Sequence, residues 1–362
     1  MARVLVGMSG GVDSSVAAAI LAARGHEVIG VSLQLYDHSD GGRAARCCSP
    51  EDFLDARRVA GAIGFPYYVI NREELFKRRV LDYFAAEYRR GRTPNPCARC
   101  NAEVKFEELV ELARGLGASA VATGHYARVE ADPVSGRRRL LRARHLEKDQ
   151  SYFLFDLTQE HLAMSLFPLG EMTKDEVRAE AARLGLATAG KPESQDVCFV
   201  EGGDYRDFLS RKMAAEGIAE PEGEIVDMEG NPLGHHRGLS GFTVGQRRHL
   251  GVSAARRLYV VLVDAGENRV VLGGEEDLTC GSLTLSGASF MSFDEPRDSF
   301  EALVRVRYRH AGARAVVSRD GDGRATVRFG EPQRGVSPGQ AAVFYDGEAL
   351  LGGGWIDTVS PS

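Results

Sequence analysis

The chain has no long uninterrupted apolar run, and this argues against a membrane-spanning helix. None of its segments approaches the roughly 18 apolar residues that are needed to cross a bilayer. A basic leader with a cleavage site is also missing, because the first residues enter a strand-like apolar run at once. These two absences predict a cytoplasmic protein that makes no membrane contact.

Cysteine is sparse, and positive charge is not in excess. Six cysteines in 362 residues exclude a disulfide framework as the basis of the fold, so we expect them to be catalytic, metal-binding or incidental. The 45 Lys and Arg residues face 51 Asp and Glu residues, which gives a net charge of −6. This balance argues against indiscriminate nucleic-acid binding but is compatible with a local basic face.

The pattern along the chain contains no internal repeat and no low-complexity tract, but it changes character twice. Residues 1 to about 125 alternate strand and helix signals, which predicts an α/β fold with a doubly wound parallel sheet. Short β-like runs begin after about residue 220, and the stretch from about Leu278 onward predicts a small barrel. The predicted domains are an α/β domain at 1–205, a small mixed and β-rich central domain at 206–276, and a β-barrel at 277–362.

A glycine loop after the first apolar run is the most informative motif. Ser9-Gly-Gly-Val-Asp-Ser14 stands between the apolar run Val4–Met8 and a helix-forming run at Val16–Ala23. A helix N-terminus offers backbone N–H groups to an anion, and adjacent glycines allow close approach. The Gly-Lys-Ser/Thr ending of a Walker A loop is missing. We therefore interpret the motif as the pyrophosphate-binding loop (PP-loop) of enzymes that split ATP into AMP and pyrophosphate; the alternative is an ordinary glycine turn.

Three cysteines form the second group of candidates. Cys97 and Cys100 lie in Pro94-Asn-Pro-Cys-Ala-Arg-Cys100, where a following helix and nearby arginines are expected to lower a thiol pKa. Half of a zinc site is the alternative, although the chain has no second Cys-x-x-Cys. Cys198 follows a polar run and precedes Phe199, so it is either a core residue or part of a sulfur relay. Cys47, Cys48 and Cys280 are interpreted as incidental.

Three basic clusters suggest that the charge is segregated. They are residues 137–148, residues 246–249 and residues 305–314. In a strand, Arg305, Arg307 and Arg309 would project from one face. A basic run is often only a solvated face, but three of them on an acidic chain suit a phosphate backbone.

At this point the motifs resemble those of a known family, the bacterial tRNA-specific 2-thiouridylases (MnmA family), over essentially the whole chain. The landmarks that carry the resemblance are Gly7–Ser14, Thr93–Pro96, Cys100-Asn101, Lys105-Phe106, Thr123–Arg128, Lys148–Phe153, Ser194–Phe199, Gly241–Arg247 and Arg305–Arg309. The resemblance implies a PP-loop (adenine nucleotide alpha hydrolase-like) domain. It also implies an adenylating sulfurtransferase that acts on the wobble uridine of the tRNAs for Lys, Glu and Gln.

The same resemblance implies a cofactor, partners and residue roles. ATP with Mg²⁺ would be used, and sulfur would come from a persulfide carrier protein or a cysteine desulfurase. Cys198 would receive the persulfide sulfur, and Cys100 would resolve it by forming a Cys100–Cys198 disulfide. The residues expected at the nucleotide are Gly7, Met8, Ser9, Gly10, Gly11, Val12, Asp13, Ser14, Leu33 and Gly124. The residues expected at the tRNA are Asn95, Pro96, Cys97, His125, Lys148, Asp149, Gln150, Arg307, Tyr308, Arg309 and Gln340.

One position departs from the pattern of the family. Some members carry Asp where this chain has Cys97, and that Asp has been assigned the role of general base. The thiol puts this role in doubt. As an alternative, Cys97, Cys100 and Cys198 are candidate ligands for three irons of a [4Fe–4S] cluster that leaves the fourth iron open to sulfide.

Overall fold

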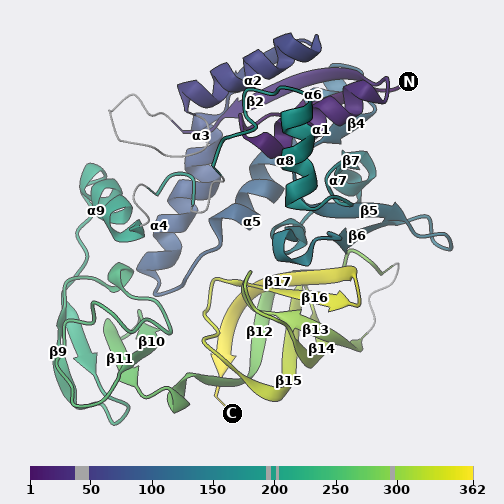
Figure 1. Ribbon diagram of the computed structural model, residues 1–362. Helices are drawn as coiled ribbons and strands as arrows, with labels where there is room; N and C mark the ends of the chain where they lie inside the picture. Colours follow the sequence, from purple (N-terminus) through teal and green to yellow (C-terminus); the bar gives the residue numbers. More distant parts are fainter. Residues whose placement is uncertain (37–48, 193–196, 201–203, 294–297, 362) are drawn as a thin grey trace. The chain divides into compact units, whose positions relative to one another are not determined.

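The computed structural model of the protein describes residues 1–36, 49–192, 197–200, 204–293 and 298–361 (Figure 1). Two compact units emerge from its contacts. The first comprises Met1–Val80, Cys97–Gly203 and Glu348–Leu350, and the second comprises Leu81–Pro96, Asp204–Gly347 and Leu351–Ser362. The three domain limits expected from the sequence stay a prediction. Within the described ranges, no helix is long and apolar enough to cross a bilayer.

The first unit is built on a parallel sheet of five strands in the order β3-β2-β1-β4-β7. The strands are β1 (Arg3–Gly7), β2 (Glu27–Gln34), β3 (Tyr67–Asn71), β4 (Ala120–Ala122) and β7 (Ser165–Leu166). The side chains of Val4, Leu5 and Val6 on the central strand are fully buried. The predicted α/β class with a parallel sheet is therefore confirmed. The carboxyl ends of β1 and β4, where such sheets bind ligands, carry the glycine loop and Gly124.

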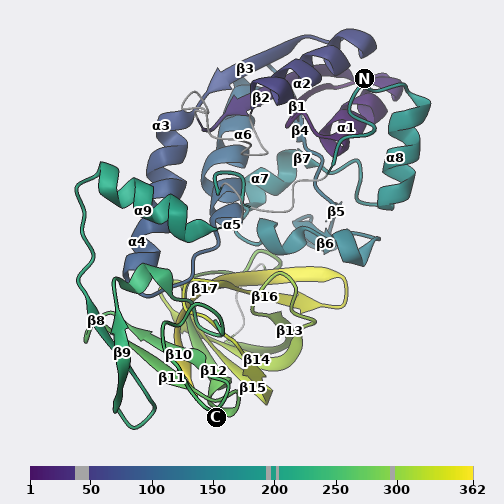
Figure 2. The same ribbon diagram turned by 60° about the vertical axis from the view of Figure 1, so that its left-hand side comes forward.

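Helices alternate with these strands. They are α1 (Val12–Ala23), α2 (Pro50–Ile63), α3 (Glu73–Phe76), α5 (Pro96–Cys100), α6 (Glu107–Gly115), α7 (Gln159–Met164) and α8 (Lys174–Arg183). Figure 2 shows α2 running along β2 and β3, which it contacts. Ser49 and Asp52 form a capping box at α2, and Thr173 and Glu176 form one at α8, patterns that are visible in the local sequence.

Short irregular helices connect several of these elements. The π-helical turns are Lys77–Leu81 and Asn101–Phe106, and the 3-10 turns are Leu146–Lys148 and Ser151–Leu154. An antiparallel hairpin of β5 (Ala127–Ala131) and β6 (Arg138–Arg142) carries part of the first basic cluster. Strand β6 of this hairpin also pairs at Leu140 and Leu141 with Leu350 and Ala349, the first residues of β17 (Ala349–Ser360).

The second unit contains two helices and two sets of strands. The helices are α4 (Asp82–Arg89) and α9 (Tyr205–Ala215), and the side chain of Asp204 caps α9. A four-stranded sheet has the order β10-β11-β8-β9, formed by Tyr259–Asp264, Arg269–Gly273, Gly223–Val226 and Pro232–His236. The 3-10 turns Leu239–Gly241 and Glu276–Leu278 accompany this sheet.

The end of the chain forms the predicted barrel, drawn in green to yellow in Figure 1. Its order is β12-β15-β14-β13-β16-β17, and a β12–β17 pairing closes the ring. The strands are β12 (Thr279–Ser289), β13 (Ser299–Arg305), β14 (Ala313–Gly321), β15 (Arg324–Arg334), β16 (Ala341–Asp346) and the greater part of β17. Buried Val304, Val317, Val327 and Phe344 fill the interior, so the barrel is a packed core.

Candidate active site

The glycine loop joins the end of β1 to the first turn of α1. Met8 is fixed on both sides, because its N–H donates to Val31 O at 2.8 Å and its carbonyl accepts from Ser32 Oγ at 2.6 Å. Ser14 Oγ accepts from Ser9 N at 3.1 Å and donates to Gly11 O at 3.2 Å. These contacts hold the loop as a tight turn in front of the helix.

The two glycines leave the start of α1 open. Gly10 has φ +71°, and a Cβ there would lie 2.3 Å from Asp52 O, so only glycine fits. Gly11 is the N-cap of α1, and no side chain of the described residues caps it. The backbone N–H groups of Val12 and Asp13 are therefore presented at the positive end of the helix dipole. Such an arrangement binds phosphate well.

Gly124, which follows the neighbouring strand β4, lies against the end of the glycine loop. A Cβ at this position would lie 2.6 Å from Ser14 N, so the backbone after β4 packs directly on the first turn of α1. Leu33, the other residue expected near the adenosine, is a buried residue of β2. The structure thus brings Gly124 and the whole stretch from Gly7 to Ser14 together in one unit.

Two residues that we did not single out from the sequence hold the side chain of Asp13. Lys174 Nζ lies 2.7 Å from Asp13 Oδ1, and the Tyr126 hydroxyl donates to the same oxygen at 2.8 Å. Lys174 is 6% exposed and is the first residue of α8. The capping box at Thr173 was visible in the sequence, but nothing local indicated that the next side chain reaches the loop.

The cysteines expected to handle sulfur lie in the first unit. Cys97 and Cys100 lie on α5, where Cys97 is half-buried and Cys100 is buried, and half-buried Cys198 lies in a turn. Arg99, between the first two thiols, is paired with Glu103 at 2.8 Å. Cys280 is buried in the barrel, where burial raises its pKa to about 11, and Cys47 and Cys48 lie outside the described residues.

A [4Fe–4S] cluster would need its three thiols gathered as one ligand set. Among the residues that the structure describes, no three His, Cys, Asp or Glu side chains form a group able to hold a metal ion. The cluster alternative for Cys97, Cys100 and Cys198 stays a prediction.

Asp156 is an acidic residue with a raised pKa that interacts with charged residues of α5 and of the π-helical turn after it. Asp156 follows the 3-10 turn at Ser151–Leu154, and burial raises its pKa to about 6. The Arg99 guanidinium opposes this change, whereas the Glu103 carboxylate adds to it. Asp156 therefore changes its charge at about pH 6, close to neutral pH.

Of the residues expected at the tRNA in the first unit, some face inward. Burial, followed by the charge of Lys105, lowers the pKa of His125 to about 3, and Thr123 Oγ1 lies 2.8 Å from its Nδ1. His125 is thus neutral. Asp149 is 1% exposed and accepts from Ala143 N and Ser151 N, each at 3.1 Å. Its carboxylate shapes the loop that carries half-buried Lys148.

Gln150 ties this loop to Tyr126. The Gln150 side-chain oxygen accepts from Tyr126 N at 3.0 Å, and Gln150 N donates to Tyr126 O at 2.8 Å. Since the Tyr126 hydroxyl reaches Asp13, the loop expected at the RNA and the loop expected at the nucleotide are joined through one residue.

In the second unit the expectation for the arginine series was wrong. Strand β13 ends at Arg305, so the three arginines do not alternate along one strand. Arg305 is 7% exposed and donates to His310 O at 3.0 Å and to Tyr308 O, which fixes the turn. Arg307 and Arg309 are exposed on that turn. Tyr308, between them, is half-buried.

The other residues expected at the tRNA in this unit lie in the stretch Thr93–Pro96 or contact it. The Gln340 side-chain amide donates to Thr93 O and Pro94 O, each at 3.1 Å. Asn95 is buried at 6% exposure, and Pro96 begins α5. Gln340 therefore holds the stretch that leads to Cys97.

The comparisons with known proteins agree with the motifs. Family models match three consecutive stretches: a tRNA methyl transferase HUP domain at residues 2–202, a tRNA methyl transferase PRC-barrel domain at 206–274 and an aminomethyltransferase beta-barrel domain at 281–356. A Geobacter metallireducens protein named tRNA-specific 2-thiouridylase MnmA is 51% identical over 360 residues, which cover 98% of this chain and 96% of the relative. This chain belongs to the tRNA-specific 2-thiouridylase (MnmA) family.

A second relative and a solved structure complete the comparison. The 2-thiouridylase of Solibacter usitatus is 48% identical over 367 residues, which cover 98% of this chain and 99% of the relative. A 4-thiouridine synthetase–RNA complex with bound ATP matches at a TM-score of 0.36 and 17% identity, over 59% of this chain and 50% of that chain. The family assigned from the motifs is confirmed by the full-length relatives.

Proposed function

We propose that this protein is a tRNA-uridine 2-sulfurtransferase. It adenylates the C2 oxygen of the wobble uridine in the tRNAs for Lys, Glu and Gln, and it then replaces that oxygen with sulfur. The products are 2-thiouridine, AMP and pyrophosphate. The observation that carries this proposal is the end-to-end match to relatives named tRNA-specific 2-thiouridylase. The PP-loop and the three thiols supply the groups that such chemistry needs.

ATP is assigned to the glycine loop. Its phosphates meet the N-terminus of α1 at Gly11, with Gly124 behind the first turn and Leu33 on the adenosine side. A carboxylate in this turn would repel phosphate, and the ammonium group of Lys174 offsets the charge of Asp13. Mg²⁺ accompanies ATP, and Asp13 is the carboxylate of the loop that could hold it. The C2 oxygen attacks the α-phosphorus, pyrophosphate leaves, and the base becomes susceptible to nucleophiles.

Sulfur is assigned to Cys198 and Cys100. Cys198 accepts a terminal sulfur from a persulfide carrier protein or a cysteine desulfurase and becomes a persulfide. The deprotonated terminal sulfur attacks C2 and expels AMP. The Cys100 thiolate then attacks Cys198 Sγ, which breaks the S–S bond, releases 2-thiouridine and leaves a Cys100–Cys198 disulfide. A thiol reductant supplies two electrons before the next turnover. Hydrosulfide released by the same thiol attack before transfer is an equivalent nucleophile.

The tRNA is assigned to residues of both units. Lys148, Arg307 and Arg309 provide positive charge for the phosphate backbone, whereas His125 is uncharged and packs beside the site. Asn95, Pro96 and Cys97 face the target base, which has to leave its stack. Tyr308 and Gln340 are further tRNA contacts assigned to the second unit, and Asp149 and Gln150 act by shaping their loop in the first.

The test is a reconstituted reaction with purified protein, ATP, Mg²⁺, a persulfide donor and an unmodified tRNA for Glu. We expect AMP and 2-thiouridine to form in equal amounts. The matched control is the same tRNA with cytidine at the wobble position. AMP formation on a small substrate without a sulfur donor would identify a different adenylating synthetase instead.

Methyl transfer is the second candidate, because the family models at residues 2–202 and 206–274 are described as tRNA methyl transferase. The two activities differ in the product nucleoside. Mass analysis of the digested tRNA separates an oxygen-to-sulfur exchange from an added methyl group. A methylated nucleoside that depends on a methyl donor would replace the proposal.

A further inference from the structure

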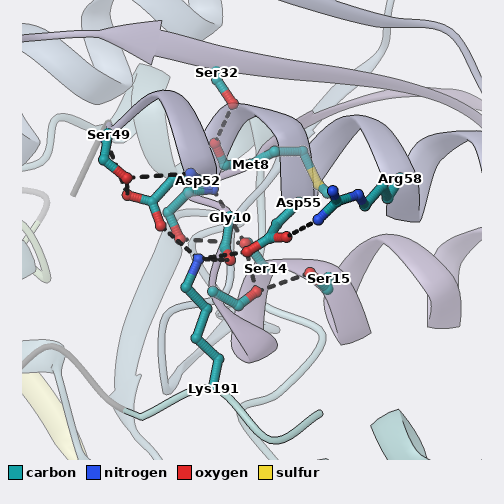
Figure 3. Close-up of polar contacts among 12 residues, drawn as sticks. Met8, Gly10, Ser14, Ser15, Ser32, Ser49, Asp52, Asp55, Arg58 and Lys191 are labelled. Carbon is teal, nitrogen blue, oxygen red and sulfur yellow. Dashed lines mark hydrogen bonds and ion pairs between the residues drawn. The ribbon is translucent and has the colours of Figure 1, made fainter. Parts of the chain in front are cut away.

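Lys191 connects the glycine loop to a helix that packs against it. Its Nζ lies 3.0 Å from Gly10 O, 2.6 Å from Asp52 Oδ1 and 2.8 Å from Asp55 Oδ2 (Figure 3). An ammonium group has three N–H donors, and these three oxygens use all of them. One side chain therefore joins the loop after β1 and the first two turns of α2.

The partners of Lys191 are themselves fixed. Asp52 is 5% exposed, and its other oxygen accepts from Ser49 N at 3.0 Å as part of the capping box. Gly10 lies directly under the Asp52 backbone, where no Cβ fits. Burial acts to lower the Lys191 pKa, but the two carboxylates outweigh it and the net pKa is raised. The ammonium group is thus a permanent positive charge at this position.

The position of Lys191 in the chain gives this contact its significance. Lys191 N donates to Thr188 O at 3.0 Å, so the backbone is held at this turn. Cys198 follows seven residues later, and the ring of its neighbour Phe199 packs edge-on against Phe76 at 5.9 Å. Lys191 and Phe199 are thus two fixed residues, one before and one after Cys198 in the chain, and residues 193–196 lie outside the described ranges.

We propose that Lys191 is a positioning residue that ties the segment bearing Cys198 to the nucleotide loop. The contact keeps the Cys198 sulfur aligned with a base activated at that loop, and this inference rests on the proposed function. Lys191 touches the carbonyl of Gly10, on the side of the loop that faces α2, and it takes no part in the phosphate chemistry. Its loss therefore separates adenylation from sulfur transfer.

The test compares Lys191→Met with Lys191→Arg and with the control Arg58→Met. Arg58 contacts Asp55 Oδ1 at 3.1 Å and does not touch the loop. Its loss therefore perturbs the same carboxylate but leaves the contact between Lys191 and Gly10 in place. In single turnovers with tRNA and a persulfide donor, the pyrophosphate released by adenylation and the 2-thiouridine formed by sulfur transfer are measured together at a fixed early time.

For Lys191→Met we expect the ratio of 2-thiouridine to pyrophosphate to fall about tenfold to a hundredfold, as misplacement of a reacting group by about 1 Å does. The KM for ATP should stay within about threefold of the wild type, because the phosphate-binding loop is intact. Lys191→Arg should recover part of the ratio, and Arg58→Met should keep it. An unchanged ratio, or a parallel loss of pyrophosphate and 2-thiouridine with a raised KM for ATP, would overturn the assignment.

A second readout does not depend on catalysis. Alkylation of Cys198 by iodoacetamide, followed by peptide mass analysis, reports how the segment is held. We expect labelling to be several-fold faster in Lys191→Met than in the wild type and unchanged in Arg58→Met. Equal rates in the wild type and both variants would refute the positioning role of Lys191. If the wild type makes no 2-thiouridine, the proposed function fails, and this labelling alone decides the role of Lys191. Asp55→Asn, which weakens the same contact, replaces Lys191→Met if that variant does not fold.

Discussion

Lys174 Nζ contacts Asp13 Oδ1 at 2.7 Å across 161 residues of sequence. The pair places a positive charge beside the first turn of α1, where the phosphates of ATP are proposed to bind. Without the lysine, the carboxylate would oppose the helix dipole and repel the phosphates. This relationship makes Lys174 part of the proposed nucleotide site, although no local pattern around Lys174 indicates a function.

Replacement of Lys174 by methionine is expected to lower kcat/KM for ATP by about 10²–10³, the size of the loss when one preorganised charge partner is removed. The half-buried carboxylate of Asp13 would also be left without its ammonium partner, so the variant should be less stable. The double variant Asp13→Asn/Lys174→Met should recover stability but not activity. Steady-state pyrophosphate release and thermal unfolding measure the two effects. Full activity in the double variant would contradict the assignment.

Lys148→Gln and His125→Gln are expected to differ in their effect on tRNA binding. Lys148 carries a charge, so its loss should reduce the slope of log K against log salt by about 1. Burial lowers the pKa of His125 to about 3, so it is neutral at pH 7 and its replacement should leave the slope unchanged. Filter binding over a salt series measures both slopes. Equal reductions would show that His125 is charged when tRNA binds.

Arg305→Met and Arg309→Ala should separate stability from binding. Arg305 is buried and holds the turn at 306–310, so its loss should lower the free energy of unfolding by about 2–4 kcal/mol. Arg309 is exposed, and its loss should weaken tRNA binding while the free energy of unfolding changes by about 0.5 kcal/mol or less. Denaturant titration and a binding assay distinguish the two. The reverse pattern would restore the single-face arrangement that the sequence suggested.

Asp156→Asn should stabilise the protein in a pH-dependent manner. Its pKa of about 6 exceeds the usual value, so the folded state binds the proton more tightly and wild-type stability falls as pH rises from about 4 to 6. Above this window the amide avoids a partly buried charge and should raise the free energy of unfolding by about 1–3 kcal/mol. Below about pH 4 the difference should vanish. Urea unfolding from pH 4 to 8 measures this dependence, and a constant difference would contradict the raised pKa.

Local patterns were sufficient for much of the fold and for the conformation of the glycine loop. The caps at Ser49 and Thr173, the alternation of strands and helices, and the Gly10-Gly11 turn all depend on neighbouring residues, and the structure confirms the corresponding elements. The family could also be recognised, since its landmarks run through the whole chain.

Features that depend on distant contacts could not be predicted. Lys174 and Lys191 meet their partners across more than a hundred residues, so no spacing rule links them to the loop. Asp149 was expected at the tRNA together with its neighbour Lys148, but its side chain is buried in the folded protein. The alternation of Arg305, Arg307 and Arg309 failed because β13 ends at the first of them, and the end of a strand depends on its partner strands.

The most direct test of the account follows one sulfur atom. Cys198 is loaded with a persulfide that carries a heavy sulfur isotope, excess donor is removed, and ATP and an unmodified tRNA for Glu are added for a single turnover. We predict that the heavy sulfur appears in 2-thiouridine with one AMP per sulfur, and that Cys198→Ala binds tRNA with unchanged affinity but forms none. Normal thiolation by Cys198→Ala would contradict the central claim.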